Sequence, residues 1–195
     1  MRWTQIAVVC AFVPLTIFSA TRMASSASVE EELQQVVAKP SPPPETEQLA
    51  PLLGNWRCTT RALQQDGGYV EGTASWKFYT ILDGFAIMDE WRAPKPDGTE
   101  SVGVNIRHYD TETEQWVAKW LSTANMKWAT FQATYQEGEF RMTGKSISPS
   151  GNAGHSRVTF FDMKKNSFKW KLDWSTDGGK TWIPDVFLIE GERIE

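Results

Sequence analysis

Residues 167–175, Ser-Phe-Lys-Trp-Lys-Leu-Asp-Trp-Ser, alternate large apolar side chains with polar ones at every step. Phe168, Trp170, Leu172 and Trp174 stand at the even positions, and serine, lysine and aspartate stand at the odd ones. Successive side chains of an extended strand point to opposite faces of a sheet, so a period of two is typical of a strand with one buried face. The stretch therefore predicts a β-strand whose even-numbered side chains pack in a core.

The same period recurs from Asn55 onward, and tight-turn sequences such as Asp-Gly and Gly-Gly separate the runs. A meander of short strands curls and closes, because closure removes the exposed edges of the sheet. We therefore expect an all-β fold, an up-and-down antiparallel barrel of about 8–10 strands, rather than an open sandwich with longer crossovers. The expected strands span residues 55–62, 70–81, 85–93, 101–109, 115–121, 128–135, 139–147, 155–163, 167–175 and 181–191, and a short helical turn is expected at 46–53.

The first 27 residues have the features of a signal peptide. A basic start at Arg2 precedes an apolar run over residues 6–18, and Ser25-Ser26-Ala27 supplies small residues for cleavage near Ala27. The run is shorter than the ~18–20 residues that span a bilayer, so we expect export rather than anchoring. The prediction is a secreted or periplasmic protein with no stable membrane span in the mature chain.

Residues 28–45 hold a cluster of prolines at positions 40, 42, 43 and 44 and are expected to form a Pro-rich linker or stalk. The barrel domain is then expected over residues 46–195. The whole chain has 20 basic and 24 acidic side chains, a net charge of −4, which disfavours nucleic-acid binding. Cleavage near Ala27 leaves 18 basic and 24 acidic side chains, net −6, and one cysteine, Cys58.

Leu53-Gly54-Asn55-Trp56 resembles the G-x-W signature of lipocalin-like, or calycin, barrels. Three further stretches, residues 81–85, 108–120 and 175–182, are similar in order and spacing to the bacterial family DUF1579, a domain of unknown function with a lipocalin-like barrel. The resemblance covers about residues 46–193. It implies that Trp56 closes one end of the barrel and that Arg193 packs across its indole, and it implies no activity.

The third expected strand carries the most informative polar residues. Asp89 and Trp91 share one face of it, and Glu90 and Arg92 share the other. Whichever face is inward, the barrel receives a carboxylate near its mouth. That carboxylate would orient a ligand or act as a general base, or else belong to an internal ion pair.

His108 shares a strand face with Val102, Val104 and Ile106, and it would point into the barrel if that face is inward. Ligation of haem iron by His108 or His155 is a minor hypothesis, and no other cofactor is predicted. No third residue completes a metal site, so no metal is predicted. Cys58 lies two residues after Trp56 and is expected inside as a small hydrophobe.

The chain has ten tryptophans, most of them at strand periods. Core packing is the first interpretation of most members of a set of six, namely Trp76, Trp116, Trp120, Trp128, Trp170 and Trp174. A barrel filled by such rings leaves no cavity, whereas an aromatic-lined cavity would bind a flat apolar molecule. Both remain open from the sequence, and Trp91, Trp120 and Trp170 are the candidate walls of such a cavity.

Ser175 to Trp182 matches the S-x-D-x-G-x-T-W pattern of the Asp-box. A single copy predicts a structural hairpin, in which Asp177 accepts backbone N–H groups and Trp182 packs beneath the turn.

Our leading hypothesis is an exported protein that binds a small apolar or aromatic molecule inside the barrel without transforming it. One alternative is an isomerase, cyclase or hydrolase that uses Asp89, Glu90 or His108 as acid–base. Another is a cell-envelope module that meets a protein or glycan partner through exposed tryptophans, and the oligomeric state is left open.

Overall fold

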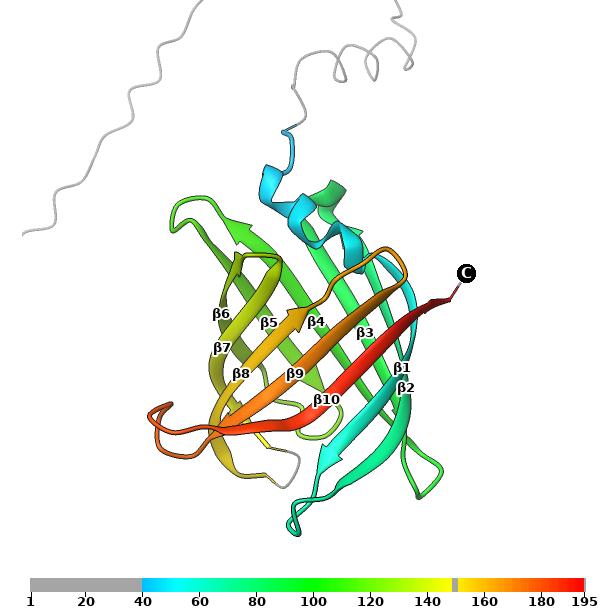
Figure 1. The fold of residues 1–195 in the computed structure, drawn as a ribbon. Coiled ribbons are helices and arrows are strands. Elements are labelled where there is room, and N and C mark those ends of the chain that lie inside the picture. The colour runs from blue at the N-terminus through cyan, green and yellow to red at the C-terminus, as the bar shows by residue number, and fades with distance from the viewer. Residues whose placement is uncertain (1–39, 149–150, 195) are drawn as a thin grey trace, which may run out of the picture. The chain divides into compact units, whose positions relative to one another are not determined.

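Ten antiparallel strands close into a barrel in the computed structural model, which describes residues 40–148 and 151–194 (Figure 1). Each strand pairs with the next one along the chain, and β1 pairs with β10 to complete the ring. The strands are β1 (Gly54–Leu63), β2 (Tyr69–Ile81), β3 (Ala86–Pro94), β4 (Glu100–Asp110), β5 (Gln115–Ser122), β6 (Ala129–Gln136), β7 (Glu139–Ile147), β8 (Ala153–Phe161), β9 (Ser167–Ser175) and β10 (Ile183–Ile194). This confirms the up-and-down antiparallel barrel, with all ten strands close to their expected positions.

Two short 3₁₀ helices accompany the strands. The helix η1 (Pro44–Leu52) precedes β1 and lies at one end of the barrel, and η2 (Leu82–Gly84) joins β2 to β3. The expected N-terminal helical turn is thus present. Leu49 and Leu52 of η1 are fully buried, so this helix packs its leucines against the barrel interior.

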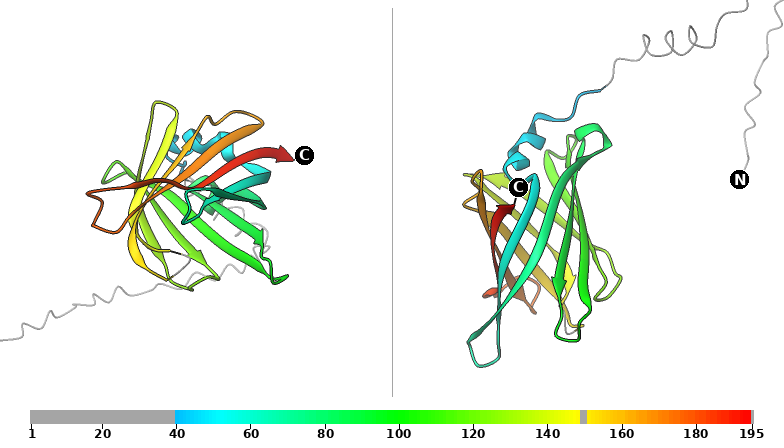
Figure 2. Two further views of the ribbon diagram at one scale, coloured as in Figure 1. Left: turned by 60° about the horizontal axis from the view of Figure 1, so that its bottom comes forward. Right: turned by 90° about the vertical axis from the view of Figure 1, so that its right-hand side faces the viewer.

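The end of the barrel opposite η1 carries the β1–β2, β3–β4, β5–β6, β7–β8 and β9–β10 connections (Figure 2). Among the residues that the structure describes, no helix is both long and apolar enough to cross a membrane. The predicted signal peptide, residues 1–27, and most of the predicted stalk lie outside the described residues.

The antiparallel register explains the core. Trp56 of β1 stands opposite Trp76 of β2 and Arg193 of β10, and Trp76 stands opposite Trp91 of β3. Residues that face one another across strands in this way share a side of the sheet. The inward side is filled mainly by aromatic rings that meet edge to face or tilted, with centroids 4.8–6.4 Å apart among Trp56, Trp76, Phe78, Trp91, Phe140, Phe160, Phe168 and Trp170.

Candidate functional site: a polar cluster inside an aromatic barrel

The barrel interior contains one buried ion pair, formed by Asp89 of β3 and Arg107 of β4. Asp89 is 0% exposed and Arg107 is 1% exposed. The Arg107 guanidinium donates through Nη1 to Oδ2 of Asp89, and the Trp76 indole donates through Nε1 to Oδ1 at 2.6 Å. Both carboxylate oxygens are therefore held by donors from neighbouring strands.

Asn105 completes a group that we call the interior polar cluster, composed of Trp76, Asp89, Asn105 and Arg107. Asn105 is the cross-strand partner of Asp89 and also of Trp120 on β5, and it is 4% exposed. Two atoms of the cluster, Asn105 Oδ1 and Arg107 Nε, are buried without a hydrogen-bond partner among the described residues. A buried polar atom left unpaired costs about 1–3 kcal/mol, so these two atoms call for a partner.

Aromatic rings surround the charges of this cluster. The guanidinium carbon of Arg107 lies 5.3 Å from the ring centroid of Phe160 and 5.6 Å from that of Phe78. Burial raises the pKa of Asp89, while the Arg107 charge and the Trp76 and Arg107 hydrogen bonds favour the ionised carboxylate and oppose that rise. Arginine keeps its charge in proteins, so the pair places a charge-neutral but strongly polar group among apolar rings.

The η1 end of the interior is closed. Trp56 is fully buried and donates from its indole to the Leu52 carbonyl at 2.7 Å, and the Trp116 indole donates to the Gln48 side chain at 3.0 Å. The Arg193 guanidinium lies 4.2 Å from the Trp56 ring and donates to the carbonyls of Pro51, Leu53 and Lys165. These contacts fasten η1 over the barrel end.

The opposite half of the interior is less completely buried. Five of its inward aromatic and apolar side chains are only half-buried, namely Trp120, Trp170, Leu172, Trp174 and Phe187. Two of these indoles lie directly on glycines of the neighbouring strand. A Cβ added to Gly103 would come within 2.1 Å of Trp120, and one added to Gly154 within 2.4 Å of Trp174. The glycines thus make room for large rings near the end of the barrel that η1 does not cover.

The structure divides the predicted ligand-binding residues between the two faces of the wall. Asp89, Trp91, Trp120 and Trp170 face inward, with Trp91 packed edge to face on Trp76 at 5.0 Å. Glu90 faces outward, where its carboxylate accepts a hydrogen bond from the Tyr79 hydroxyl at 2.8 Å and raises the pKa of that hydroxyl. The inward carboxylate is therefore Asp89, and its partner is Arg107 rather than Arg92.

His108 also faces outward and is exposed, so the condition under which it would reach the interior is not met. The inward positions of β4 are Gly103, Asn105 and Arg107, and the Val102, Val104 and Ile106 face is the outer one. His155 lies between the inward Gly154 and Ser156 and points outward as well. Neither imidazole is therefore in a position to ligate a haem inside the barrel.

Cys58 is fully buried in the interior as expected, and burial raises the pKa of its thiol to about 12. Such a thiol stays protonated and is a poor nucleophile at neutral pH. No group of three or more His, Cys, Asp or Glu side chains that could hold a metal ion occurs within residues 40–148 and 151–194.

One of the tryptophans assigned to the core lies elsewhere. Trp128 is the last residue of the β5–β6 connection, directly before β6, and its side chain is 55% exposed. The strand expected over residues 128–135 starts one position before β6, and for this reason it wrongly includes Trp128.

The Asp-box forms a hairpin between β9 and β10. Asp177 accepts hydrogen bonds from the backbone of Lys180 and Thr181 and from the hydroxyls of Ser175 and Thr181. These donors, the Thr181 hydroxyl first among them, hold the pKa of Asp177 well below its usual range. Trp182 lies half-buried beside the turn, with the Arg157 guanidinium 4.5 Å from its ring.

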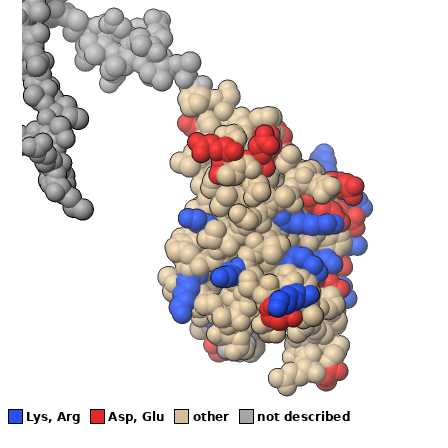
Figure 3. Space-filling model, turned by 90° about the vertical axis from the view of Figure 1, so that its left-hand side faces the viewer, with Lys and Arg blue, Asp and Glu red and all other residues tan. Residues whose placement is uncertain are grey.

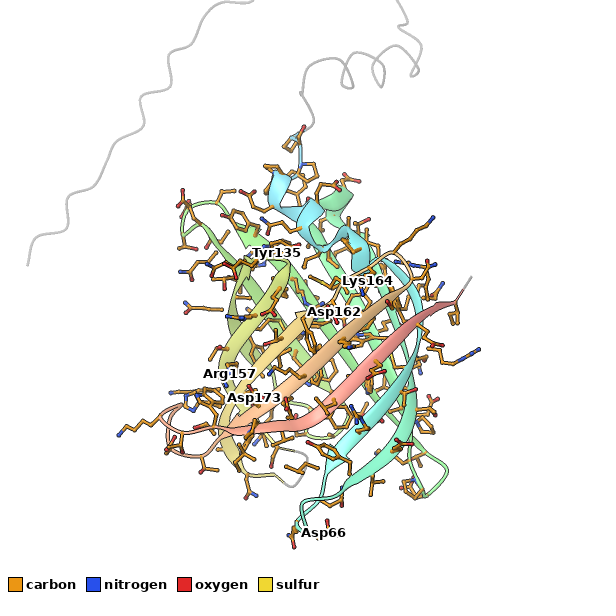
Figure 4. The ribbon with its side chains drawn as sticks, viewed as in Figure 1. Asp66, Tyr135, Arg157, Asp162, Lys164 and Asp173 are labelled. Carbon is orange, nitrogen blue, oxygen red and sulfur yellow. The ribbon has the colours of Figure 1, made fainter. Side chains whose placement is uncertain are left out.

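Arg157 connects this hairpin to the outer wall of the barrel. It pairs with Asp173 of β9 at 2.8–2.9 Å, and both residues are seen side by side in Figure 4. A groove of about 340 Å³ runs along this outer face over β7, β8 and β9, lined by Glu139, Arg141, Arg157, Thr159, Phe161, Lys171 and Asp173. Basic side chains are distributed over this side of the molecule, with acidic ones near the η1 end (Figure 3). Each basic residue of the groove is paired with a carboxylate, so the groove has no unbalanced charge.

Sequence reasoning missed Asn105 and Arg107, because the valine and isoleucine face of β4 looks like the buried one. Two signals would have found them. An inward Asp89 needs a counter-charge, and the short β3–β4 hairpin restricts the candidates to residues near its cross-strand partner. Gly103 on the same face also indicates that a large side chain approaches there.

Comparisons with known proteins agree with this architecture. Residues 41–181 match the family described as "Protein of unknown function (DUF1579)". A search of the curated proteins gave no match. Among solved structures, the S-type phycobiliprotein lyase CPES from Guillardia theta has a similar fold, with a TM-score of 0.52 and 13% sequence identity over 76% of this chain and 92% of that one.

Proposed function

This chain belongs to the DUF1579 family, and we propose that it binds a small, flat, apolar or aromatic molecule inside its barrel without transforming it. The observation that carries the proposal is the interior polar cluster, which leaves Asn105 Oδ1 and Arg107 Nε unpartnered within an otherwise aromatic interior. Ligand sites are typically apolar and hold a few convergent polar groups that set the orientation of the ligand.

The ligand reaches the interior from the end opposite η1. The η1 end is held shut by Trp56, Trp116 and Arg193, whereas Trp120, Trp170 and Trp174 toward the other end remain half-buried. Flat rings stack favourably on such indoles, since aromatic pairs gain about 0.5–1.5 kcal/mol beyond the burial of their area. The half-buried rings are the part of the interior that a ligand contacts first.

The arrangement favours binding over acid–base catalysis. A general base must reach a proton of the substrate, but Asp89 is 0% exposed and each of its oxygens already accepts a hydrogen bond, one from Trp76 and one from Arg107. Glu90 and His108, the other two candidate acid–base residues, lie on the outer face.

The phycobiliprotein lyase supports the proposal through its fold alone, because the two sequences are 13% identical. A closed barrel of this kind is consistent with a small apolar ligand. We place the protein outside the cytoplasm, secreted or periplasmic, because residues 1–27 have the features of a cleaved signal peptide.

The test is native mass spectrometry of the protein purified from its own cells, followed by titration with the neutral fluorescent probe N-phenyl-1-naphthylamine. We expect a retained non-protein mass, or probe fluorescence that saturates at one probe per chain. Trp170→Ala should weaken probe binding, and Trp128→Ala, the same change at an exposed position, should not. A chain that carries no additional mass and does not enhance probe fluorescence would contradict the proposal.

A further inference from the structure

The chemistry of the two unpartnered atoms restricts the ligand further. Arg107 Nε carries an N–H group, which needs an acceptor, and Asn105 Oδ1 is a carbonyl oxygen, which needs a donor. Both side chains are more than nine-tenths buried. Solvent at the surface therefore does not satisfy them, and a partner must lie inside the barrel.

The two residues are placed to meet one molecule. Asn105 and Arg107 are two positions apart on β4, so both project from the same face of the strand, about 7 Å apart along it. Asn105 lies opposite Trp120, one of the half-buried rings, and Arg107 lies beside Phe160. A ring stacked against the aromatic wall would carry its polar group toward this pair.

The charge of the cluster is already balanced. Arg107 is paired with Asp89, and the remaining member of the cluster with hydrogen-bonding capacity, Asn105, is neutral. A ligand carboxylate or sulfonate placed here would be a third charge in an apolar interior, close to the Asp89 carboxylate and without a cation of its own. A ligand cation would compete with Arg107 and Trp76 for the Asp89 carboxylate and would leave an uncompensated positive charge in the interior.

We propose that the interior polar cluster selects neutral ligands whose polar group is both a donor and an acceptor, as in a carboxamide or lactam, and rejects the corresponding anions. The ligand group accepts from Arg107 Nε–H and donates to Asn105 Oδ1. This inference rests on the proposed function and adds to it the chemical class of the ligand.

The experiment compares three probes with the same ring system by displacement of N-phenyl-1-naphthylamine from the full chain. 2-Naphthamide is neutral and both donates and accepts, 2-acetylnaphthalene is neutral and only accepts, and 2-naphthoate is an anion at pH 7. We expect 2-naphthamide to bind at least tenfold more tightly than 2-naphthoate and severalfold more tightly than 2-acetylnaphthalene. These ratios are measured on the unchanged protein and so do not depend on the folding of a variant.

Asn105→Leu provides the matched variant, since it removes the acceptor at similar volume. Its affinity for 2-naphthamide should fall about tenfold, while its affinity for 2-acetylnaphthalene should change less than twofold, provided that circular dichroism shows the fold retained. Equal affinities of the unchanged protein for all three probes would overturn this inference and leave the proposed function standing; that result is expected if ordered water already satisfies both atoms. Absence of binding by every probe, N-phenyl-1-naphthylamine included, would instead overturn the proposed function and the inference with it.

Discussion

Among single residues, Arg107 balances the buried charge of the barrel interior. It neutralises Asp89 where neither group contacts solvent, and its guanidinium also packs against Phe78 and Phe160. A buried ion pair is not in itself a strong source of stability, because desolvation offsets the attraction. Removal of one partner of the pair, however, leaves the charge of the other partner buried without compensation.

Arg107→Met should therefore destabilise the fold by about 3–5 kcal/mol, measured by urea unfolding at pH 7. The double variant with Asp89→Asn should recover part of that loss, because no isolated charge remains. Arg92→Met removes an exposed pair with Glu100 and serves as the control, with an expected cost of about 0–1 kcal/mol. Equal costs at the two arginines would show that the Asp89–Arg107 pair is not buried as described.

At the scale of the elements, the β9–β10 hairpin is organised by one carboxylate. Asp177 gathers the N–H groups of Lys180 and Thr181 and two hydroxyls, and all of these hydrogen bonds favour its ionised form. Because the folded-state pKa lies below the unfolded value of about 3.9, Asp177 stabilises the fold above pH 4. That contribution is lost as the pH falls from about 4 through the lower folded pKa.

Asp177→Asn should consequently unfold at a lower temperature than the unchanged protein at pH 7, with the difference shrinking as the pH is lowered below 4. Thermal unfolding followed by circular dichroism between pH 7 and pH 2 measures this. Thr181→Val removes one of the donors, the hydroxyl at 2.6 Å, and should show a smaller version of the same trend. A difference that stays constant down to pH 2 would contradict the assignment.

The helix η1 is the second element whose position depends on a few named side chains, and Arg193 makes the largest number of these contacts. Arg193 of β10 joins it to the barrel by stacking on Trp56 and donating to three carbonyls, two of which belong to residues 51 and 53 at the end of η1. Guanidinium geometry allows several carbonyls to be reached at once, and an ammonium on a flexible stem does not reproduce it.

Both Arg193→Ala and Arg193→Lys should lower the free energy of unfolding, the first by about 2–4 kcal/mol and the second by most of that amount. Arg141→Ala, which breaks an exposed pair with Glu139, should cost less than about 1 kcal/mol. Full stability of Arg193→Lys would mean that charge alone fastens η1.

At the scale of the whole molecule, the barrel separates the tryptophans into an inner and an outer population. Trp56, Trp76, Trp91 and Trp116 are buried within the barrel, and Trp120, Trp170 and Trp174 are half-buried on its inward face. Trp128 is the strongly exposed tryptophan of the described residues. The inner population closes the η1 end of the barrel and lines the interior toward the other end.

Iodide, which does not penetrate the protein, should therefore quench Trp128 more strongly than any other tryptophan of the described residues, and Trp128→Phe should remove the largest single part of the quenchable fluorescence. Trp116→Phe is the matched control and should leave the quenchable part unchanged. Quenching that affects most of the emission, with Trp128→Phe making no difference, would contradict the division into inner and outer rings.

The candidate site was partly predictable from the sequence, and the reason differs from residue to residue. Four candidates lie inside, as expected for residues that alternate in step with large apolar neighbours on the same strand face: Asp89, Trp91, Trp120 and Trp170. Glu90 and His108 lie outside, because a strand offers two faces and its own residues do not say which one closes the core.

The strands, their order and the barrel follow from local signals, a period of two and Gly-rich turns, because a meander joins each strand to the next one along the chain. The inward face of β4 depends instead on contacts with other strands. Valine and isoleucine suit either face of a barrel wall, whereas Arg107 and Gly103 belong inside for reasons that lie on other strands, the charge of Asp89 and the bulk of Trp120. Charge balance and ring packing depend on the register between strands, and register brings together residues that lie far apart in the sequence.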